Sequence, residues 1–262
     1  MSWWEGVLLG VVQGFTEFLP ISSSGHLVVV EAVLGITTPG VVIEVVLHVA
    51  TLLAVVIVYR KVLWRLAAGA VVGDHTAWRY IGLLAIGTVP AALAGLFLAE
   101  WFEQAFQSLM LVGLNFLITG TVLWSTRERV RHAARPSPST KGAFGIGVAQ
   151  ALAILPGISR SGTTVAAAIW LGVDPVRAAE FSFLLAVPAI AGAAVLQIPN
   201  LSGGLVSAGA LPVAAGFLAA LVSGVAAIRL LIFLLRNKVF HRFAPYCWGV
   251  GALTILLASL GM

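Results

Sequence analysis

The chain alternates between long apolar segments and short polar connections over almost its whole length. Six of the apolar segments have about 18 residues or more, enough for a helix to cross roughly 30 Å of hydrocarbon. They cover residues 41–58, 80–99, 107–124, 181–198, 209–235 and 244–261. The pattern predicts an all-α polytopic membrane protein with six transmembrane helices, in which residues 1–262 form a single membrane domain.

Two further apolar segments, 3–35 and 144–173, are interrupted near the middle by proline, glycine and a run of hydroxyl residues. Each half has about 10 to 16 residues, too few to span as one helix. The pattern predicts re-entrant helix-turn-helix hairpins with buried or water-facing turns, whose second helices begin near His26 and Thr163. A single helix with a proline kink is the alternative, but SSSG and SRSG are poor sequences for a helix interior.

The two interrupted segments are related in sequence. When the chain is shifted by 137 residues, 8 of the 19 positions in 10–28 are identical to those in 147–165. Each copy then holds one hairpin and three predicted spans, and because three is odd, the second copy enters the membrane inverted. We therefore expect inverted-topology repeats of about 1–137 and 138–262, with a functional site near the midplane where the two turns meet.

The composition agrees with a membrane protein, since 60% of the residues are hydrophobic and only 10% are charged. The single cysteine, Cys247, excludes an internal disulfide. Three connections hold 13 of the 15 lysines and arginines, and basic loops usually mark the cytoplasmic side. The net charge of +5 is thus no sign of nucleic-acid binding. Both termini and the entry of the first hairpin are expected on the extracytoplasmic side, so the active site is expected to face that side.

The polar groups gather at the two turns. The first turn offers Glu17, Ser22, Ser23, Ser24 and His26, and the second, residues 156–164, offers an arginine among serines and threonines. Helix N-termini and a guanidinium both bind phosphate well. A charged arginine inside a membrane is energetically costly, so its presence indicates a functional role. The alternative is an ion pair with Glu17 that only joins the two repeats.

Two questions of chemistry stay open at this point. Gln13 and Glu17 are four residues apart and share a helix face, where they could orient a water, a hydroxyl or a divalent cation. His26 could act as a base, an acid or a nucleophile, so attack by Ser23 activated by His26 and attack by His26 itself are both possible. His48 has no polar residues near it in the sequence and is interpreted as a buried core histidine.

These residues resemble the undecaprenyl-diphosphate phosphatase family of the integral-membrane, bacitracin-resistance type. The resemblance covers essentially the whole chain. One motif, (Glu/Gln)-x-x-x-Glu, runs from Gln13 to Glu17 and continues into FLPISSSGHL; the other, Pro-Gly-x-Ser-Arg-Ser-x-x-Thr, runs from Pro156 to Thr164. The resemblance implies hydrolysis of undecaprenyl diphosphate to the monophosphate and inorganic phosphate in a bacterial cell membrane. That reaction recycles the lipid carrier for peptidoglycan and other envelope polymers.

The motifs also imply the site residues. Catalytic roles fall to Glu17, Ser23, His26 and Arg160. Substrate binding is assigned to Gln13, Ser22, Ser24, Gly25, Ser159, Ser161, Gly162, Thr163 and Thr164. A divalent cation, magnesium or calcium, is expected with Glu17 as its ligand; many members of the family have Glu where this chain has Gln13, which leaves one carboxylate here.

The expected partners are the polyprenyl diphosphate substrate, membrane lipid and a second copy of the chain in a homodimer, and nucleic acid is not expected. The alternative function is a flippase or transporter of polyprenyl-phosphate lipids, because inverted repeats with broken helices are common in transporters. Ser23 and His26 beside Arg160 favour the enzyme, since a carrier needs phosphate ligands but no nucleophile.

Overall fold

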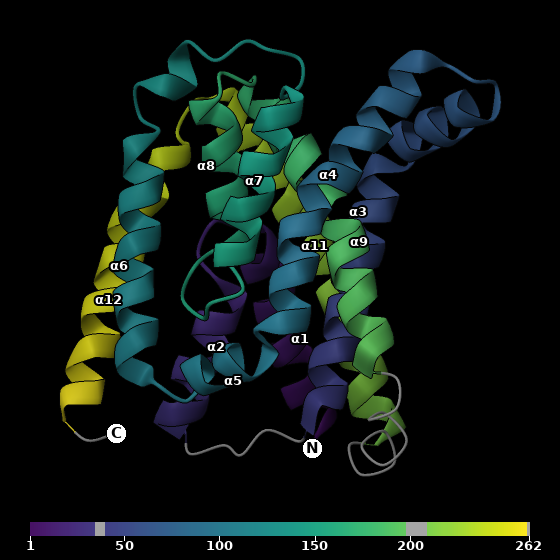
Figure 1. Cartoon of the computed structure of the whole chain (residues 1–262). Helices are drawn as coiled ribbons and strands as arrows, with labels where there is room; N and C mark the ends of the chain where they lie inside the picture. The colour runs from purple at the N-terminus through teal and green to yellow at the C-terminus, as the bar shows by residue number, and fades with distance from the viewer. Residues whose placement is uncertain (35–39, 198–208, 261–262) are drawn as a thin grey trace.

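The computed structural model describes residues 1–34, 40–197 and 209–260 (Figure 1). Within these ranges the chain forms helices joined by turns, and no β-strand is present. Most of the helices lie side by side along one common direction, and the two termini are at the same end of the bundle (Figure 1). The all-α fold class predicted from the apolar pattern is confirmed.

Four of the described helices are long and apolar enough to cross a membrane, which makes this a multi-pass membrane protein. They are α3 (Gly40–Val71), α4 (His75–Phe97), α9 (Pro175–Gln197) and α11 (Ala210–Arg236). The 17-residue α6 (Leu109–Ser125) meets the same test only together with the short α5 (Ala99–Phe106), from which it is bent by 98°. The last helix, α12 (Ala244–Ser259), has 16 residues. Each predicted span overlaps a helix over its described residues, with residues 198 and 261 lying outside the described part of the chain, but two of the helices are shorter than a full span.

The first of the three basic connections, which holds Arg60, Lys61, Arg65 and Arg79, is helical, whereas the sequence predicted a loop. The helix α3 continues past the expected end at residue 58 to Val71, with a kink at Tyr59 (φ −97°, ψ 15°). The next helix begins directly afterwards, where the Asp74 side chain accepts a hydrogen bond from the backbone N–H of Thr76. Arginine and lysine are good helix formers, so charge alone does not end a helix. The two helices together form an arm that projects from the bundle (Figure 1, upper right).

The two interrupted segments each form a pair of short helices that turns back on itself. The first pair is α1 (Trp3–Phe18) with α2 (Ser23–Leu34), and the second is α7 (Thr140–Leu152) with α8 (Arg160–Trp170). The first pair occupies the half of the bundle that holds the termini and the second pair the opposite half, so the two turns meet between them (Figure 1). This arrangement excludes one continuous kinked helix for either segment.

The second helix of each pair begins three residues earlier than the sequence suggested, at Ser23 and Arg160 instead of His26 and Thr163. Ser22 has a left-handed backbone (φ 67°), which breaks the chain direction just before the first helix. Ser159 caps the second helix by accepting a hydrogen bond from the backbone N–H of Gly162 at 3.1 Å. Serine is a good N-cap residue, although it is poor inside a helix.

The helices of the two halves follow one another in the same order. A shift of 137 residues carries the start of α1 onto the start of α7 and the start of α2 onto the start of α8. The same shift brings the starts of α3, α4 and α6 to within two residues of those of α9, α11 and α12. The contacts follow this correspondence, because α1 packs against α11 and α7 packs against α4.

Small residues let α1 approach α11 closely. A Cβ atom added at Gly10 would lie 2.2 Å from the carbonyl oxygen of Gly216, and one added at Gly14 would lie 2.0 Å from Oγ of Ser223. No side chain fits at these two positions, so close helix packing depends on the glycines. The packing fixes the helix that carries Gln13 and Glu17.

Candidate active site

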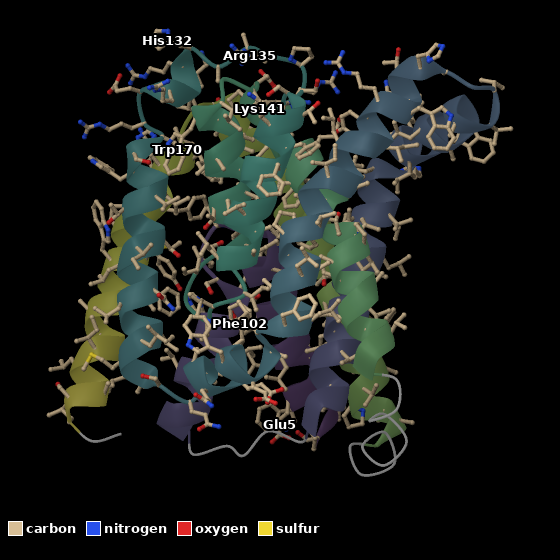
Figure 2. All side chains as sticks on the ribbon, in the orientation of Figure 1. Glu5, Phe102, His132, Arg135, Lys141 and Trp170 are labelled. Carbon is tan, nitrogen blue, oxygen red and sulfur yellow. The ribbon has the colours of Figure 1, made fainter. Side chains whose placement is uncertain are left out.

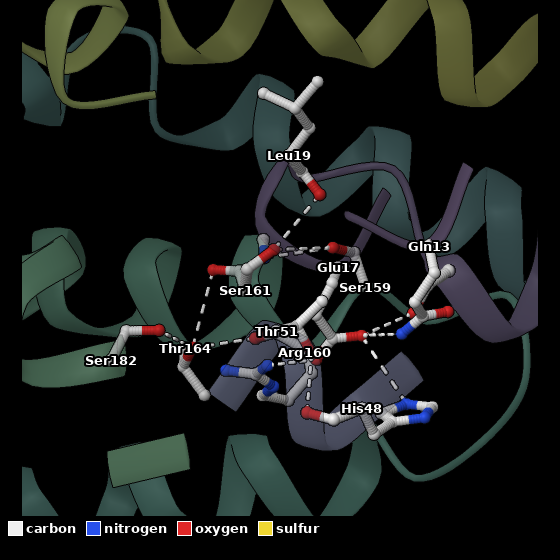
Figure 3. A network of polar contacts seen from close by, with 12 residues as sticks. Gln13, Glu17, Leu19, His48, Thr51, Ser159, Arg160, Ser161, Thr164 and Ser182 are labelled. Atoms are coloured by element: carbon white, nitrogen blue, oxygen red, sulfur yellow. Dashed lines mark hydrogen bonds and ion pairs between the residues drawn. The ribbon is translucent and has the colours of Figure 1, made fainter. Parts of the chain in front are cut away.

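The turns of the two hairpins are in direct contact. A Cβ atom added at Gly25, in the first hairpin, would lie 2.8 Å from Cα of Gly157 in the second. The Ser161 hydroxyl donates a hydrogen bond to the carbonyl of Leu19 at 3.2 Å (Figure 3). The turns therefore bring together the two parts of the chain that the sequence analysis selected.

Helix α6 holds the second turn in place through two buried side chains. Asn115 Nδ2 donates to the carbonyl of Pro156 at 2.8 Å. The Thr119 hydroxyl donates to the carbonyl of Gly157 at 2.9 Å and accepts from the backbone N–H of Ser159 at 3.1 Å. The sequence analysis missed both residues. Their signal was two polar side chains four residues apart on one face of an otherwise apolar segment.

Glu17 is the centre of the polar network. Arg160 Nη2 forms an ion pair with Oε1 of this carboxylate, which joins the two turns. The second oxygen, Oε2, accepts a hydrogen bond from the Ser23 hydroxyl at 2.8 Å and another from Gln13 Nε2 at 3.1 Å. Both Glu17 and Gln13 are buried. Four of the residues selected from the sequence thus meet at one carboxylate.

The histidine beside this carboxylate is His48, which corrects its interpretation as a core residue. His48 Nε2 lies 3.7 Å from Glu17 Oε2, and the side chain is 35% exposed (Figure 3). It comes from α3, far from the two motifs in the sequence, so no local pattern marked it. The imidazole and the carboxylate lie within ion-pair distance of each other, although 3.7 Å is too long for a hydrogen bond.

His26 lies apart from the Glu17 network. Its Nδ1 is 2.7 Å from the carbonyl of Ser22, and since a carbonyl only accepts, Nδ1 carries the proton. Nε2 then accepts a hydrogen bond from the Tyr246 hydroxyl at 2.8 Å. The imidazole also stacks on the Tyr246 ring and meets the edge of Phe116. Both ring nitrogens have protein partners, and the visible role of His26 is to hold the backbone just before Ser23.

A cavity of about 320 Å³ opens beside the network. Its polar lining comes from both hairpins and from α3, and its other wall is apolar and comes from α3, α9 and the turn between α7 and α8. The polar residues are Thr16, Glu17, Ser22, Ser23, Ser24, His48, Gln150, Ser159 and Arg160. The apolar residues are Val45, Ala153, Ile154, Ile158, Ala189, Ile190, Ala193 and Ala194. A cavity with one polar side and one apolar side suits a ligand that has a charged end and a hydrophobic end.

The predicted substrate-binding residues divide into two groups. Ser22, Ser24 and Ser159 line this cavity. The others lie outside its lining: Gln13, Gly25, Ser161, Gly162, Thr163 and Thr164. Two of these have structural contacts instead: Ser161 donates to the carbonyl of Leu19 in the first turn, and the Thr164 hydroxyl donates to the carbonyl of Arg160 within α8 at 2.7 Å and lies 2.6 Å from the Ser182 hydroxyl of α9.

The donor set does not fit a divalent cation held by protein side chains alone. Among the described residues, no three His, Cys, Asp or Glu side chains gather at one place. Glu17 is the single carboxylate in the described lining of the cavity, and both of its oxygens already accept from Arg160, Ser23 or Gln13. Magnesium and calcium usually need more oxygen ligands than one such carboxylate offers.

Comparison with known proteins identifies the family. The model of the bacitracin resistance protein BacA family matches residues 6–253. The chain belongs to the BacA family. It is 44% identical to an undecaprenyl-diphosphatase of Desulfosudis oleivorans over 266 residues, which covers 96% of this chain and 97% of the relative. It is 41% identical to one of Desulfatibacillum aliphaticivorans, with 99% of each chain covered, and 37% identical to one of Desulforapulum autotrophicum, with 98% of each covered.

Membership of the BacA family confirms the resemblance drawn from the two motifs. The matched residues include all of the second hairpin, the first hairpin from residue 6 onward, and the whole Glu17 network. The relatives compared carry the name of a phosphatase and not that of a transporter. The flippase alternative therefore gains no support.

Proposed function

We propose that this protein hydrolyses undecaprenyl diphosphate to undecaprenyl monophosphate and inorganic phosphate at the cavity beside Glu17. The observation that carries the proposal is the pair of contacts on this carboxylate: the Ser23 hydroxyl donates to one oxygen and Arg160 to the other. A nucleophile, a base and a phosphate-binding cation are the parts that phosphoryl transfer needs.

In the first step Ser23 Oγ attacks the terminal phosphorus, and Glu17 takes the hydroxyl proton over the 2.8 Å hydrogen bond. The Oγ–phosphorus bond forms and the bond between phosphorus and the bridging oxygen breaks. Undecaprenyl monophosphate leaves and takes up the proton from Glu17. Arg160 Nη1 is buried and has no partner among the described residues, so it is the donor that can bind the charged phosphoryl oxygens.

In the second step water attacks the phosphorus of phosphoserine, and Glu17 takes a proton from that water. The phosphorus–Oγ bond breaks, inorganic phosphate leaves, and Ser23 Oγ recovers its proton from Glu17. The sum is one lipid diphosphate and one water converted to lipid monophosphate and inorganic phosphate. Direct attack by His26 is not favoured, because its two nitrogens face Ser22 and Tyr246.

The cavity also supports a lipid substrate. Its polar side, around Arg160, suits the diphosphate, whereas Val45 and Ala194 belong to an apolar wall formed by α3 and α9. A polyprenyl chain that leaves between these two helices would stay in hydrocarbon, where transfer of apolar surface from water is most favourable. A water-soluble diphosphate would gain nothing from this wall.

For the topology we propose six transmembrane helices and two re-entrant hairpins, as inverted repeats of about 1–137 and 138–262, in the cell membrane of a bacterium. The matching helix starts of the two halves support the repeats.

His132, Arg135 and Lys141 lie at one end of the molecule, and Glu5 lies at the other (Figure 2). Because basic connections usually lie on the cytoplasmic side, the end with His132, Arg135 and Lys141 faces the cytoplasm, and the end with Glu5 and the termini faces away from it. Val45 and Ala194 lie near the terminus-side ends of their helices, so the cavity faces the same side.

The divalent cation and the homodimer remain expectations. A magnesium or calcium ion would bind mainly through the diphosphate of the substrate, with Glu17 as its one protein carboxylate. Titration of purified, chelator-treated protein with each cation would test the first expectation, and light scattering in detergent would test the second.

The deciding experiment is release of inorganic phosphate from undecaprenyl diphosphate by the purified protein in detergent. We expect turnover by the wild-type protein and none above background by Ser23→Ala. ATP and inorganic diphosphate serve as competing substrates. Equal rates on those two compounds, or full activity of Ser23→Ala, would contradict the proposal.

A further inference from the structure

Gln150 lines the active-site cavity with an amide that has no hydrogen bond among the described residues. The residue is only 2% exposed, and neither Nε2 nor Oε1 has a partner there. Buried amides are nearly always paired, because an unpaired one loses its hydration without compensation. A buried, unpaired amide that faces a cavity indicates that a ligand supplies the missing partner.

Comparison of the two halves of the chain explains why this amide is unpaired. Gln150 on α7 corresponds to Gln13 on α1 under the shift of 137 residues. Gln13 Nε2 donates at 3.1 Å to Glu17, four residues further along the same helix. Four residues after Gln150 the chain has Ile154, so the second helix has no carboxylate at that place. Gln13 therefore pairs with a carboxylate of its own helix, whereas the amide of Gln150 is left for another partner.

The second hairpin provides a further unpaired donor at the same cavity. Arg160 Nη2 is bound to Glu17, but Nη1 is buried and has no partner among the described residues. Arg160 and Gln150 both belong to the cavity lining. The first hairpin thus supplies the carboxylate and the nucleophile, whereas the second supplies donors that suit an anion.

We propose that Gln150 is a substrate-binding residue, whose Nε2–H donates a hydrogen bond to a non-bridging oxygen of the bound diphosphate beside Nη1 of Arg160. This inference rests on the proposed function, since it names a contact within that active site. A neutral amide adds a directed hydrogen bond without a second positive charge. The contact forms in the substrate complex as well as in the transition state, so its loss raises KM more than it lowers kcat.

The test compares Gln150→Ala and Gln150→Glu with Gln104→Ala, which changes an exposed glutamine on α5. Two quantities are measured: kcat and KM for farnesyl diphosphate, and the Kd of a non-hydrolysable farnesyl methylenediphosphonate. A hydrogen bond to a charged group corresponds to about 10- to 100-fold in affinity, so Gln150→Ala should raise KM and Kd by that factor. Gln150→Glu has nearly the same shape but repels the anion, and should bind more weakly still.

The outcomes separate this inference from the proposed function. Wild-type kinetics and probe affinity in both Gln150 variants would overturn the inference and leave the function intact. A wild-type protein that binds the probe but releases no phosphate would overturn the function instead. If Gln150 were only structural, Gln150→Glu would bind the probe better than Gln150→Ala, and the melting temperature would fall without a selective rise in KM. That pattern would also overturn the inference.

Discussion

Ser23 and Arg160 stand at equivalent positions in the two halves of the chain and donate to the two oxygens of the same carboxylate. Each is the first residue of the helix that follows its turn, and a shift of 137 residues carries one onto the other. Ser23 reaches Oε2 of Glu17 and Arg160 reaches Oε1. The difference between the two halves is thus chemical: a nucleophile occupies one position and a cation the other.

Arg160→Lys should be nearly as inactive as Arg160→Ala, with kcat lower by about 100-fold or more in both. Lysine keeps the charge but has a single ammonium, which cannot hold Glu17 and a phosphoryl oxygen in the fixed geometry of a guanidinium. Phosphate release from farnesyl diphosphate measures the effect. Arg177→Lys is the matched control, because Arg177 is half exposed and pairs only with Glu180 among the described residues. If Arg160→Lys kept more than about a tenth of the wild-type kcat, the role of the guanidinium fork would be refuted.

Glu17→Gln should abolish turnover without unfolding the protein. The amide is nearly isosteric with the carboxylate but takes no proton from Ser23, which donates to it at 2.8 Å. Rapid acid quenching of the wild-type enzyme with substrate labelled at the terminal phosphorus should trap acid-stable phosphoserine on Ser23. Acid-labile phosphohistidine would instead point to an attacking imidazole. Retained phosphate release by Glu17→Gln would exclude the carboxylate as the base.

The proposed topology predicts that Gln104→Cys reacts with a membrane-impermeant maleimide on intact cells and that His132→Cys reacts only after the membrane is opened. Gln104 lies on α5 and His132 in the basic connection between α6 and α7, and both are exposed. The native Cys247 is fully buried, so its background labelling should be low. The reverse labelling pattern would invert the assignment and place the cavity on the cytoplasmic side.

The helices and the two turns could be predicted from the sequence because their signals are local. A long apolar run has the length of a span, and Pro, Gly and Ser interrupt a helix wherever they gather. The Glu17–Arg160 ion pair was expected only as an alternative, and the sequence could offer it because both residues lie at or next to these interruptions. The helical arm after Tyr59 was missed, since basic residues were interpreted as a loop although they favour helices.

What could not be predicted is the packing of one helix face against another. His48 was interpreted as a core residue because its neighbours in the sequence are apolar, yet it lies 3.7 Å from Glu17 on a different helix. Gln150 lines the cavity, but in the sequence it is only one of the eight positions that are identical in the two interrupted segments. Periodicity tells which residues share a face, but not what that face meets.

Asn115→Ala and Thr119→Val should destabilise the second turn. Each removes a buried side-chain partner of the backbone at Pro156 to Ser159, at a cost of about 1 to 3 kcal/mol in the free energy of unfolding. Activity should fall as well, because this turn positions Arg160. Thermal unfolding in detergent and phosphate release measure both effects. Thr88→Val is the control, since among the described residues that hydroxyl bonds only to Leu84 of its own helix. Equal melting temperatures for all three variants would contradict the anchoring role.

Replacement of His48 and replacement of His26 should affect activity and stability differently. His48→Ala should lower kcat/KM about tenfold with little change in melting temperature, because His48 faces Glu17 in the cavity and is partly exposed. His48→Gln keeps a donor there and should recover part of the activity.

His26→Ala should lower the melting temperature and the activity together, since it removes the hydrogen bond to the Ser22 carbonyl that supports the turn before Ser23. Tyr246→Phe removes only the hydroxyl that donates to His26 Nε2 and should have a smaller effect on both. If His26→Ala lost its activity at an unchanged melting temperature, His26 would belong to the chemistry and not to the support of the turn.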